Sequence, residues 1–249
     1  GGTDVLATVG ERYHVLQNEE LFDFGDALLD GGRWETAGSI KDGRVVFGSL
    51  ALERETVLDP NGVSDVVKSY LLVHTSHDGS TAVQASITPV RVVCANTLNM
   101  ALSGVKQSFK IRHTQTVGGK VAAAREALSL ANSYLDQFDK EAQALIAKEI
   151  TKAKFDKIVE AIYPRPDKDA KGAVKKWETK VDLLEEIYGS DTTNMISGTA
   201  WGAFNALTER LDWFRKGRGE RGAENVLAAA SGFDPVTNAE KGKILAAVK

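Results

Sequence analysis

Alternating apolar and polar positions are the clearest pattern in the first part of the chain. Four segments show this pattern, and turns that contain Asp-Gly join them in pairs: residues 34–40 with 44–53, and residues 70–76 with 81–93. Asp-Gly between alternating segments is typical of a β-hairpin, so the pattern predicts an antiparallel four-stranded meander. Residues 18–30 carry apolar residues at helical spacing after an Asn18 N-cap, which predicts a helix before the meander.

The end of the meander predicts an irregular edge and a returning strand. Pro89 lies inside the fourth segment and cannot donate a ladder hydrogen bond, so this strand is expected at an edge or with a bulge. Residues 95–103 are expected to form a short helix, and residues 108–114 a fifth strand. The alternation of that strand separates an apolar face from a basic one: Phe109 and Ile111 against Lys110 and Arg112.

From residue 121 onward the pattern is helical. An intermittent apolar stripe up to residue 162 predicts one long helix or two stacked helices, and Pro164 and Pro166 end it. Further helices are expected at residues 173–188, 199–216 and 224–231, with a last turn after residue 238. The sequence thus predicts an α+β fold, an antiparallel β-meander packed against helices. We expect an α+β core at residues 1–163 and a helical C-terminal region at residues 164–249.

Composition places the protein among globular chains. The 249 residues are 43% hydrophobic, enough for a full core, and no apolar run approaches the roughly 20 residues that a membrane span needs. The single cysteine, Cys94, suits a reducing compartment, so we expect a soluble protein in the cytoplasm of a host cell, without a membrane partner. Because the chain begins with Gly1-Gly2-Thr3 and without Met, we also expect either a tag remnant or a fragment whose natural N-terminus lies further upstream.

The distribution of charge is more informative than the net charge of −3. Residues 79–125 contain no Asp or Glu but six basic residues: Arg91, Lys106, Lys110, Arg112, Lys120 and Arg125. A local positive field of this kind favours contact with the phosphates of a nucleic acid. The alternative is a chance gap in a solvated surface.

Two groups of residues invite a catalytic or metal-binding interpretation. His74, His77 and Asp78 could ligate a metal or supply a general base, but His77-Asp78-Gly79 is explained more simply as a tight turn. Cys94 and His113 could pair as nucleophile and base, yet no glycine-rich elbow or oxyanion hole is visible near Cys94, which favours a buried small hydrophobe. No catalytic residue, metal or cofactor is therefore predicted.

Two further features bear on anion and base binding. Gly118-Gly119-Lys120 precedes a predicted helix and could hold a phosphate, although a hinge explains the glycines equally well. A second basic group surrounds Trp213 and Phe214: Arg210, Arg215, Lys216, Arg218 and Arg221. Aromatic residues beside arginines can stack on unpaired bases, but helical spacing favours core packing for four of the aromatic and aliphatic positions: Trp201, Phe204, Leu211 and Phe214.

Several stretches resemble an uncharacterised family of phage and plasmid-like proteins from actinobacteria and their phages. The matching stretches are residues 10–19, 35–39, 76–80, 88–98, 111–114, 198–201, 205–209 and Asp212. Pro-Val-Arg-Val-Val-Cys at residues 89–94 is the most specific of them. The resemblance implies a phage or prophage setting and an N-terminal region that precedes this chain, and it supplies no reaction or catalytic residue.

The predicted order of elements is also similar to the core of phage single-strand annealing proteins of the RecT and Redβ type. This resemblance implies a basic groove between sheet and helix that holds an extended single strand, and subunits that associate into rings or filaments. We therefore expect a phage-type protein that binds and anneals single-stranded DNA in recombination, without covalent chemistry. The alternatives are a phage-derived protein-interaction or host-interference module, indifferent to nucleic acid, and a metal-dependent enzyme that uses His74, His77 and Asp78.

Overall fold

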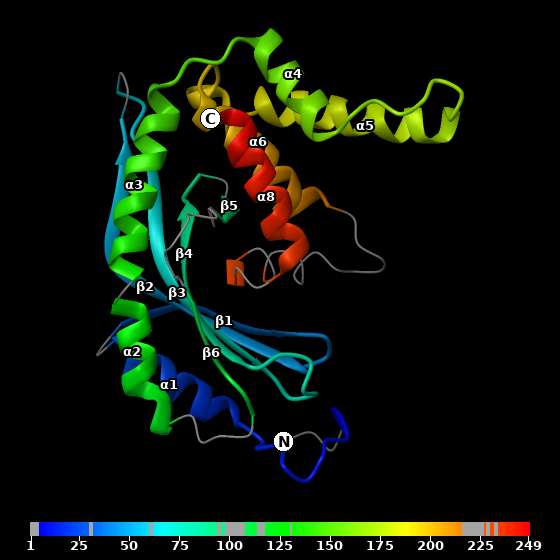
Figure 1. Ribbon diagram of the computed structural model, residues 1–249. Helices are drawn as coiled ribbons and strands as arrows, with labels where there is room; N and C mark the ends of the chain where they lie inside the picture. Colours follow the sequence, from blue (N-terminus) through cyan, green and yellow to red (C-terminus); the bar gives the residue numbers. More distant parts are fainter. Residues whose placement is uncertain are drawn as a thin grey trace.

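The structure, a computed structural model, describes residues 5–29, 32–59, 62–93, 96–97, 108–113, 118–129, 131–215, 227, 230–231 and 234–249. Figure 1 shows a twisted antiparallel sheet with helices against one of its faces and a group of helices from the C-terminal part of the chain beyond one of its ends. The fold is α+β, as the sequence predicts.

Helix α1 (Asn18–Leu29) confirms the first predicted helix. Its first turn is acidic, which suits the positive end of the helix dipole, and Glu20 Oε2 accepts a hydrogen bond of 2.8 Å from the backbone N–H of Gln17. The apolar side of the helix is buried against the sheet through residues at helical spacing: Leu21, Phe24 and Leu28.

The meander is present with the predicted order and turns. Its strands are β1 (Arg33–Ile40), β2 (Val45–Leu58), β3 (Asp65–Ser76) and β4 (Val83–Arg91), each antiparallel to the next. The first turn holds three residues in the left-handed region, with φ of 55° at Lys41, 54° at Asp42 and 83° at Gly43. Strands β2 and β3 extend beyond the predicted bounds and make the longest ladder, interrupted by a register shift between Ala51 and Glu55.

Two short strands share the outer edge of β4. Strand β5 (Asn96–Thr97) pairs with Val90 and Arg91, and β6 (Ser108–Ile111) pairs with residues 83–86. Pro89 lies between these two contacts, where the described chain places no outer strand, and its register with β3 is continuous. The prediction that this strand lies at an edge of the sheet or carries a bulge is therefore wrong for β4 as a whole, because β5 and β6 pair along it and its register with β3 is continuous. Pro89 itself is accommodated at a position that none of the described outer strands pairs with.

The segment between β4 and β6 differs from the prediction. Asn96 and Thr97 form a strand, so the helix predicted for residues 95–103 is wrong at these two positions. The rest of the predicted helix, with Lys106 and Cys94 on either side of it, lies outside the described residues. The returning strand is confirmed over Ser108–Ile111.

The long helical stretch is divided into three helices, α2 (Val121–Ser129), α3 (Ala131–Ala147) and α4 (Lys152–Ile162). Between α3 and α4 the chain leaves the helical path because the backbone N–H of Ile150 donates to the carbonyl oxygen of Gly198 at 2.8 Å. Thr151 then caps α4 by accepting a hydrogen bond from the N–H of Lys154. The break thus depends on a distant segment, which helical periodicity does not reveal.

The C-terminal part is helical, as predicted. Its elements are α5 (Lys171–Tyr188), the 3-10 turn η3 (Asn194–Ile196), α6 (Ala200–Glu209), the π-helical turn η4 (Arg210–Phe214) and α8 (Pro235–Val248). Helix α8 is longer than the predicted last turn, because Asp234 caps it with Pro235 in its first turn. Most of the helix predicted for residues 224–231 lies outside the described residues.

Two hydrophobic clusters organise the structure. One lies between the sheet and helices α1 and α2, and the other joins α4, α5, α6 and α8 with Leu58 and Val67 of the sheet. The clusters meet within α3, where Leu135 belongs to the first and Phe138 to the second. Figure 1 shows α3 passing along both groups of elements. The boundary predicted after residue 163 stays a prediction, and the hydrophobic packing divides earlier, inside α3.

Candidate nucleic-acid interface

Strand β6 presents two basic side chains beside an apolar face. Ile111 is buried and Phe109 packs in the same cluster, which includes residues of α2. Lys110 lies on the opposite face of the strand and is exposed, and Arg112, directly after the strand, is exposed as well. The predicted separation of an apolar and a basic face is therefore confirmed for Phe109, Lys110 and Ile111, and Arg112 lies beyond the end of the strand.

Two more of the predicted cations belong to α2 and the turn before it. Lys120 ends the 3-10 turn η2 (Gly118–Lys120) and is partly buried, whereas Arg125 is exposed on α2. The Nε of Arg125 donates to the carbonyl oxygen of Ala27 at 2.6 Å and so links α2 to α1. Phosphate contact at the turn stays a prediction. Because α2 packs on the apolar face of β6, Lys110 lies on the opposite side of the sheet from α2. Lys110, Lys120 and Arg125 therefore do not line a single groove between the sheet and a helix.

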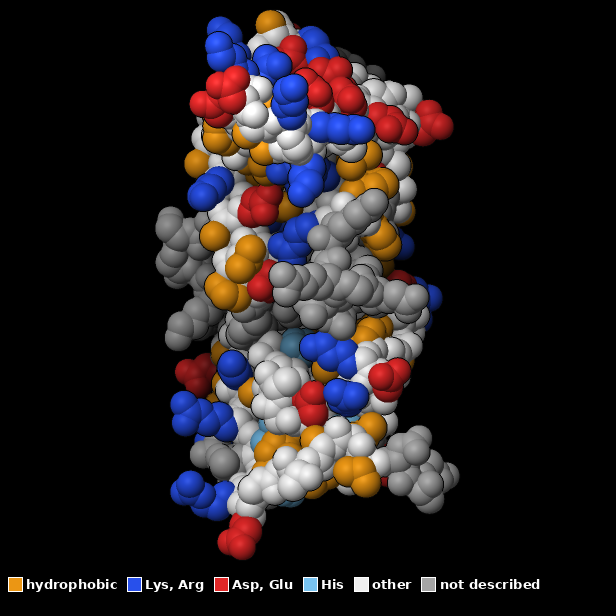
Figure 2. Space-filling model, turned by 90° about the vertical axis from the view of Figure 1, so that its right-hand side faces the viewer, with side chains coloured by type: hydrophobic (Ala, Val, Ile, Leu, Met, Phe, Trp, Pro, Cys, Tyr) orange, Lys and Arg blue, Asp and Glu red, His pale blue; other side chains and the backbone are white. Residues whose placement is uncertain are grey.

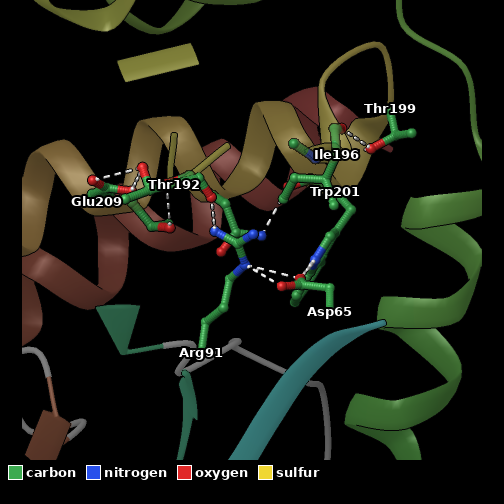
Figure 3. Close-up of polar contacts among 10 residues, drawn as sticks. Asp65, Arg91, Thr192, Ile196, Thr199, Trp201 and Glu209 are labelled. Carbon is green, nitrogen blue, oxygen red and sulfur yellow. Dashed lines mark hydrogen bonds and ion pairs between the residues drawn. The ribbon is translucent and has the colours of Figure 1, made fainter. Parts of the chain in front are cut away.

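Arg91 does not belong to an exposed interface. Its side chain is 2% exposed, and its Nε donates to both carboxylate oxygens of Asp65 at 2.8 Å. Its Nη1 donates to the carbonyl oxygen of Thr192. Figure 3 shows the guanidinium enclosed between Asp65 of β3 and the segment that carries Thr192. A phosphate cannot reach a guanidinium in this position, so the sequence prediction of a phosphate contact by Arg91 is corrected.

The Arg91 network joins the sheet to the helical cluster. Trp201 of α6 donates from Nε1 to Asp65 Oδ2 at 2.8 Å, and Thr192 Oγ1 contacts the carboxylate of buried Glu209 at 3.1 and 3.2 Å. Sequence reasoning missed Asp65, Trp201 and Glu209 as partners. One signal was available, because Arg91 continues the alternation of Val83, Ala85 and Ile87, which face the core.

The face of the sheet that carries Lys110 is polar, but the side chains at its centre are buried. Gln84, Ser86 and Thr88 of β4 are buried there, and one side-chain oxygen of each has no hydrogen-bond partner in the described part of the chain. Their alternation with Val83, Ala85 and Ile87 is the pattern of a strand with a solvent-facing side. The row itself is buried, whereas Lys110 and Arg112 at the edge of the sheet are exposed. Lys68 of β3 lies on the same face, half exposed, and pairs with Glu55 at 3.6 Å.

His74 lies beside this edge. It is buried, and burial lowers its pKa from 6.5 to about 4, with Lys110 adding to the decrease and a hydrogen bond to Gln84 opposing it. Figure 2 shows pale-blue histidine atoms in the lower half of the molecule, with both basic and acidic side chains near them. A neutral His74 adds no charge to the basic edge at neutral pH.

His77 and Asp78 form the tight turn that the sequence favours. Asp78 Oδ1 accepts a hydrogen bond of 2.9 Å from the N–H of Ser80, and His77 Nε2 lies 2.8 Å from Asn18 Oδ1. Among the residues that the structure describes, no three His, Cys, Asp or Glu side chains are grouped to hold a metal ion. The metal site considered for His74, His77 and Asp78 is therefore not formed.

His113 has a structural environment. Its ring stacks on Tyr13 with centroids 4.6 Å apart, and its Nε2 lies 3.2 Å from Thr75 Oγ1 and 3.0 Å from the carbonyl oxygen of Thr81. These contacts fasten the N-terminal segment to the end of the β3–β4 hairpin. The proposed partner of His113 in a nucleophilic pair, Cys94, lies outside the described residues.

A family model described as a domain of unknown function, DUF932, matches residues 5–231. The chain belongs to the DUF932 family. The match covers both the sheet and the helical cluster, and it brings no assigned activity. Comparison of the chain with curated proteins and with solved structures gave no match.

The second basic group of this DUF932 chain lies partly within the described residues. Arg210 pairs with Glu240 at 3.9 Å and Arg215 with Asp234 at 3.8 Å. The remaining members, Lys216, Arg218 and Arg221, lie outside the described residues. Core packing is confirmed for Trp201, Phe204 and Leu211, which are buried, and it is wrong for Phe214, which is 46% exposed.

Length and apolar character decide whether a helix of the DUF932 chain could span a membrane. The longest of them, α5, carries charged side chains along its whole length. Within the described ranges, no helix has both the length and the apolar character to cross a membrane.

Proposed function

We propose that this protein binds single-stranded nucleic acid through the basic edge of its sheet, defined by Lys110 and Arg112. The observation that carries the proposal is the exposure of both side chains, Lys110 on the polar face of β6 and Arg112 directly after the strand, inside a stretch without acidic residues, residues 79–125. Exposed Arg125 and partly buried Lys120 lie on the other side of the same edge and extend the positive charge.

The geometry suits a phosphate backbone better than a compact ligand. Lys110 on β6 and Arg112 just after it are two positions apart in the chain. Alternate residues of extended chain are about 6.7 Å apart, so two cations at a comparable spacing would meet two points of an extended polyanion. Cations that neutralise phosphates release counterions, which gives affinity that decreases with salt and carries little sequence preference. We therefore infer binding of single strands without a defined target sequence.

The finer parts of the proposal come from the resemblance to annealing proteins. We propose that the chain promotes annealing of complementary strands in phage recombination, in the cytoplasm of a host cell, as a ring or filament of identical subunits. Annealing brings paired bases together and needs no general acid, general base or metal, so the proposal includes no covalent chemistry. A protein-interaction or host-interference module remains the alternative, and indifference to nucleic acid would favour it.

The experiment compares charge removal at the basic edge with equal charge removal elsewhere. Binding of a fluorescein-labelled oligothymidylate is followed by anisotropy for the wild type, for Lys110→Ala with Arg112→Ala, and for Lys154→Ala with Lys157→Ala on the exposed side of α4. Loss of two phosphate contacts lowers the affinity about 25-fold at 0.1 M salt, whereas the α4 variant binds as the wild type does. Equal affinities of the two variants would refute the assignment of the edge.

A further inference from the structure

Strand β1 leaves one long edge of the sheet open. It is the first strand in the order β1-β2-β3-β4, and no other part of the described chain pairs with its outer side. Three of its central side chains are exposed: Thr36, Ala37 and Ser39. The outer N–H and C=O groups of such a strand are a template on which another extended chain can continue the ladder.

The middle of β1 lacks the features that usually protect an open edge. Proteins block edge strands with Pro, with charged side chains, above all Lys, or by keeping the strand short. Residues 36–40 read Thr-Ala-Gly-Ser-Ile and contain neither Pro nor a charge. The opposite edge of the sheet is protected, because β6 has only four residues and carries Lys110. The open edge of β1, with eight residues, is therefore the one suited to pairing with a further strand.

We propose that β1 pairs with β1 of a second copy of this chain, antiparallel and about a two-fold axis near Gly38. Two identical strands in antiparallel contact are self-complementary, so this interface closes a dimer and joins the two sheets into one. The inference goes beyond nucleic-acid binding and does not rest on it. A ring or filament of subunits would need a second contact between such dimers.

Charge at the two ends of β1 selects this occupant and its direction. One end carries Arg33 and Glu35, and the turn after the other end carries Lys41 and Asp42, all of them exposed. Positions 35 and 41 are equally far from Gly38, so antiparallel pairing brings Glu35 of each copy to Lys41 of the other. It also brings Arg33 toward the turn that holds Asp42. Parallel pairing would instead place each charge beside its own like, which is destabilising.

The proposed contact leaves the basic edge accessible. Strands β1 and β6 lie at opposite edges of the sheet, so a dimer through β1 carries Lys110 and Arg112 of its two copies at the far sides of the joined sheet. Dimerisation and nucleic-acid binding therefore use different residues and can be tested separately.

The first experiment blocks the edge and measures the oligomeric state by sedimentation velocity over a concentration series. Positions 37 and 39 lie opposite each other across the proposed axis, so Ala37→Lys with Ser39→Lys places like charges together. This variant should dimerise at least about 10-fold more weakly than the wild type. The matched control, Ala153→Lys with Ala161→Lys on the exposed side of α4, adds the same charge and should dimerise as the wild type does.

The second experiment tests the antiparallel register by exchange of charge. Lys41→Glu places a carboxylate opposite Glu35 of the other copy and leaves the contacts of Glu35 with Arg33 and Tyr70 in place. It should weaken the dimer roughly 5- to 30-fold, because two symmetric pairs change from attraction to repulsion. Lys41→Glu combined with Glu35→Lys restores opposite charges and should recover most of the affinity. Damage to folding does not produce such a recovery.

Each result either supports the contact or refutes it. Slower amide hydrogen exchange over residues 36–40 at dimer concentrations supports it, and unchanged exchange there places the interface elsewhere and refutes it. A wild type that stays monomeric up to about 1 mM refutes it as well. So does a variant with Ala37→Lys and Ser39→Lys that dimerises normally, or a charge exchange without recovery.

Binding of oligothymidylate by the same proteins separates this inference from the proposed function. A wild type that binds nucleic acid but does not dimerise through β1 refutes the contact and leaves the basic edge standing. A wild type that dimerises through β1 but binds no nucleic acid supports the contact and removes the proposed function.

Discussion

The guanidinium of Arg91 and the carboxylate of Asp65 form an ion pair in which neither side chain is more than 2% exposed. Arg91 ends β4 and Asp65 begins β3, so the pair closes one end of the central hairpin. The same carboxylate accepts a hydrogen bond from Trp201 of α6, and Arg91 donates to the backbone of Thr192. The pair therefore connects the sheet with the helical cluster, and its burial keeps a phosphate from reaching the guanidinium.

Replacement of Arg91 tests this structural role. Arg91→Met keeps much of the apolar stem but leaves the Asp65 carboxylate buried without a cation, so we expect the free energy of unfolding to decrease by about 3–5 kcal/mol. Urea unfolding followed by circular dichroism measures the change. Lys110→Met, on the exposed edge, should stay within about 0.5 kcal/mol of the wild type. If Arg91→Met lost as little stability as Lys110→Met, the result would contradict a buried ion pair at Arg91.

A double variant separates loss of the pair from loss of packing. Arg91→Met combined with Asp65→Leu removes both charges, so part of the lost stability should return. Additive losses from the two single substitutions would show that the residues act independently, contrary to the contact at 2.8 Å.

Burial of His74 predicts a pH dependence of stability. Its pKa in the folded protein is lowered to about 4 by burial, against 6.5 in the unfolded chain. The contribution of neutral His74 to the free energy of unfolding is complete above pH 6.5. It decreases as the pH falls toward 4, because in this range the imidazole takes up a proton in the unfolded chain but not in the folded protein. Between pH 7.5 and pH 5 the loss is about 2 kcal/mol.

His74→Leu removes this titration. The variant should lose less stability than the wild type between pH 7.5 and pH 5, as measured by urea unfolding at the two pH values. Gln84 and Lys110 face the imidazole and remain in both proteins, so they do not account for the difference. Equal pH dependence in the two proteins would show that His74 ionises normally in the folded state.

Replacement by alanine should have opposite effects on stability at two helical glycines, Gly202 and Gly172. A Cβ at Gly202 of α6 would collide with the carbonyl group of Ile196, whereas a Cβ at Gly172 of α5 meets nothing within 4 Å. We expect Gly202→Ala to destabilise by about 1–3 kcal/mol or more, and Gly172→Ala to stabilise by about 0.5–1 kcal/mol through helix propensity. Thermal unfolding of both variants checks the pair, and a stabilised Gly202→Ala would rule out the close approach of η3 to α6.

Local signals account for the parts of the fold that could be predicted. The hairpins follow from alternation around Asp-Gly turns, and α1 follows from its N-cap and apolar spacing, because these depend on neighbouring residues. The break between α3 and α4 depends on the hydrogen bond from Ile150 to Gly198, about fifty positions away, and helical periodicity continues across it.

The residues of the candidate site also divide into those whose positions follow from local sequence and those whose positions depend on distant contacts. The exposed position of Lys110 follows from the alternation of β6, a local property. The burial of Arg91 depends on Asp65, Thr192 and Trp201, which come from three separate segments. The number of basic residues in a segment does not distinguish a cation that pairs internally from one that faces solvent.

The salt dependence of binding to single-stranded nucleic acid tests the central claim most directly. The observed association constant for an oligothymidylate is measured by anisotropy from about 50 to 200 mM salt for the wild type and for Lys110→Ala with Arg112→Ala. Each phosphate contact contributes about 0.7 to the slope of log K against log salt for a single strand, so the slope of the double variant should be shallower by about 1.4. Parallel lines for the two proteins, or no binding by the wild type at the lowest salt, would contradict the claim that the basic edge of the sheet holds phosphates.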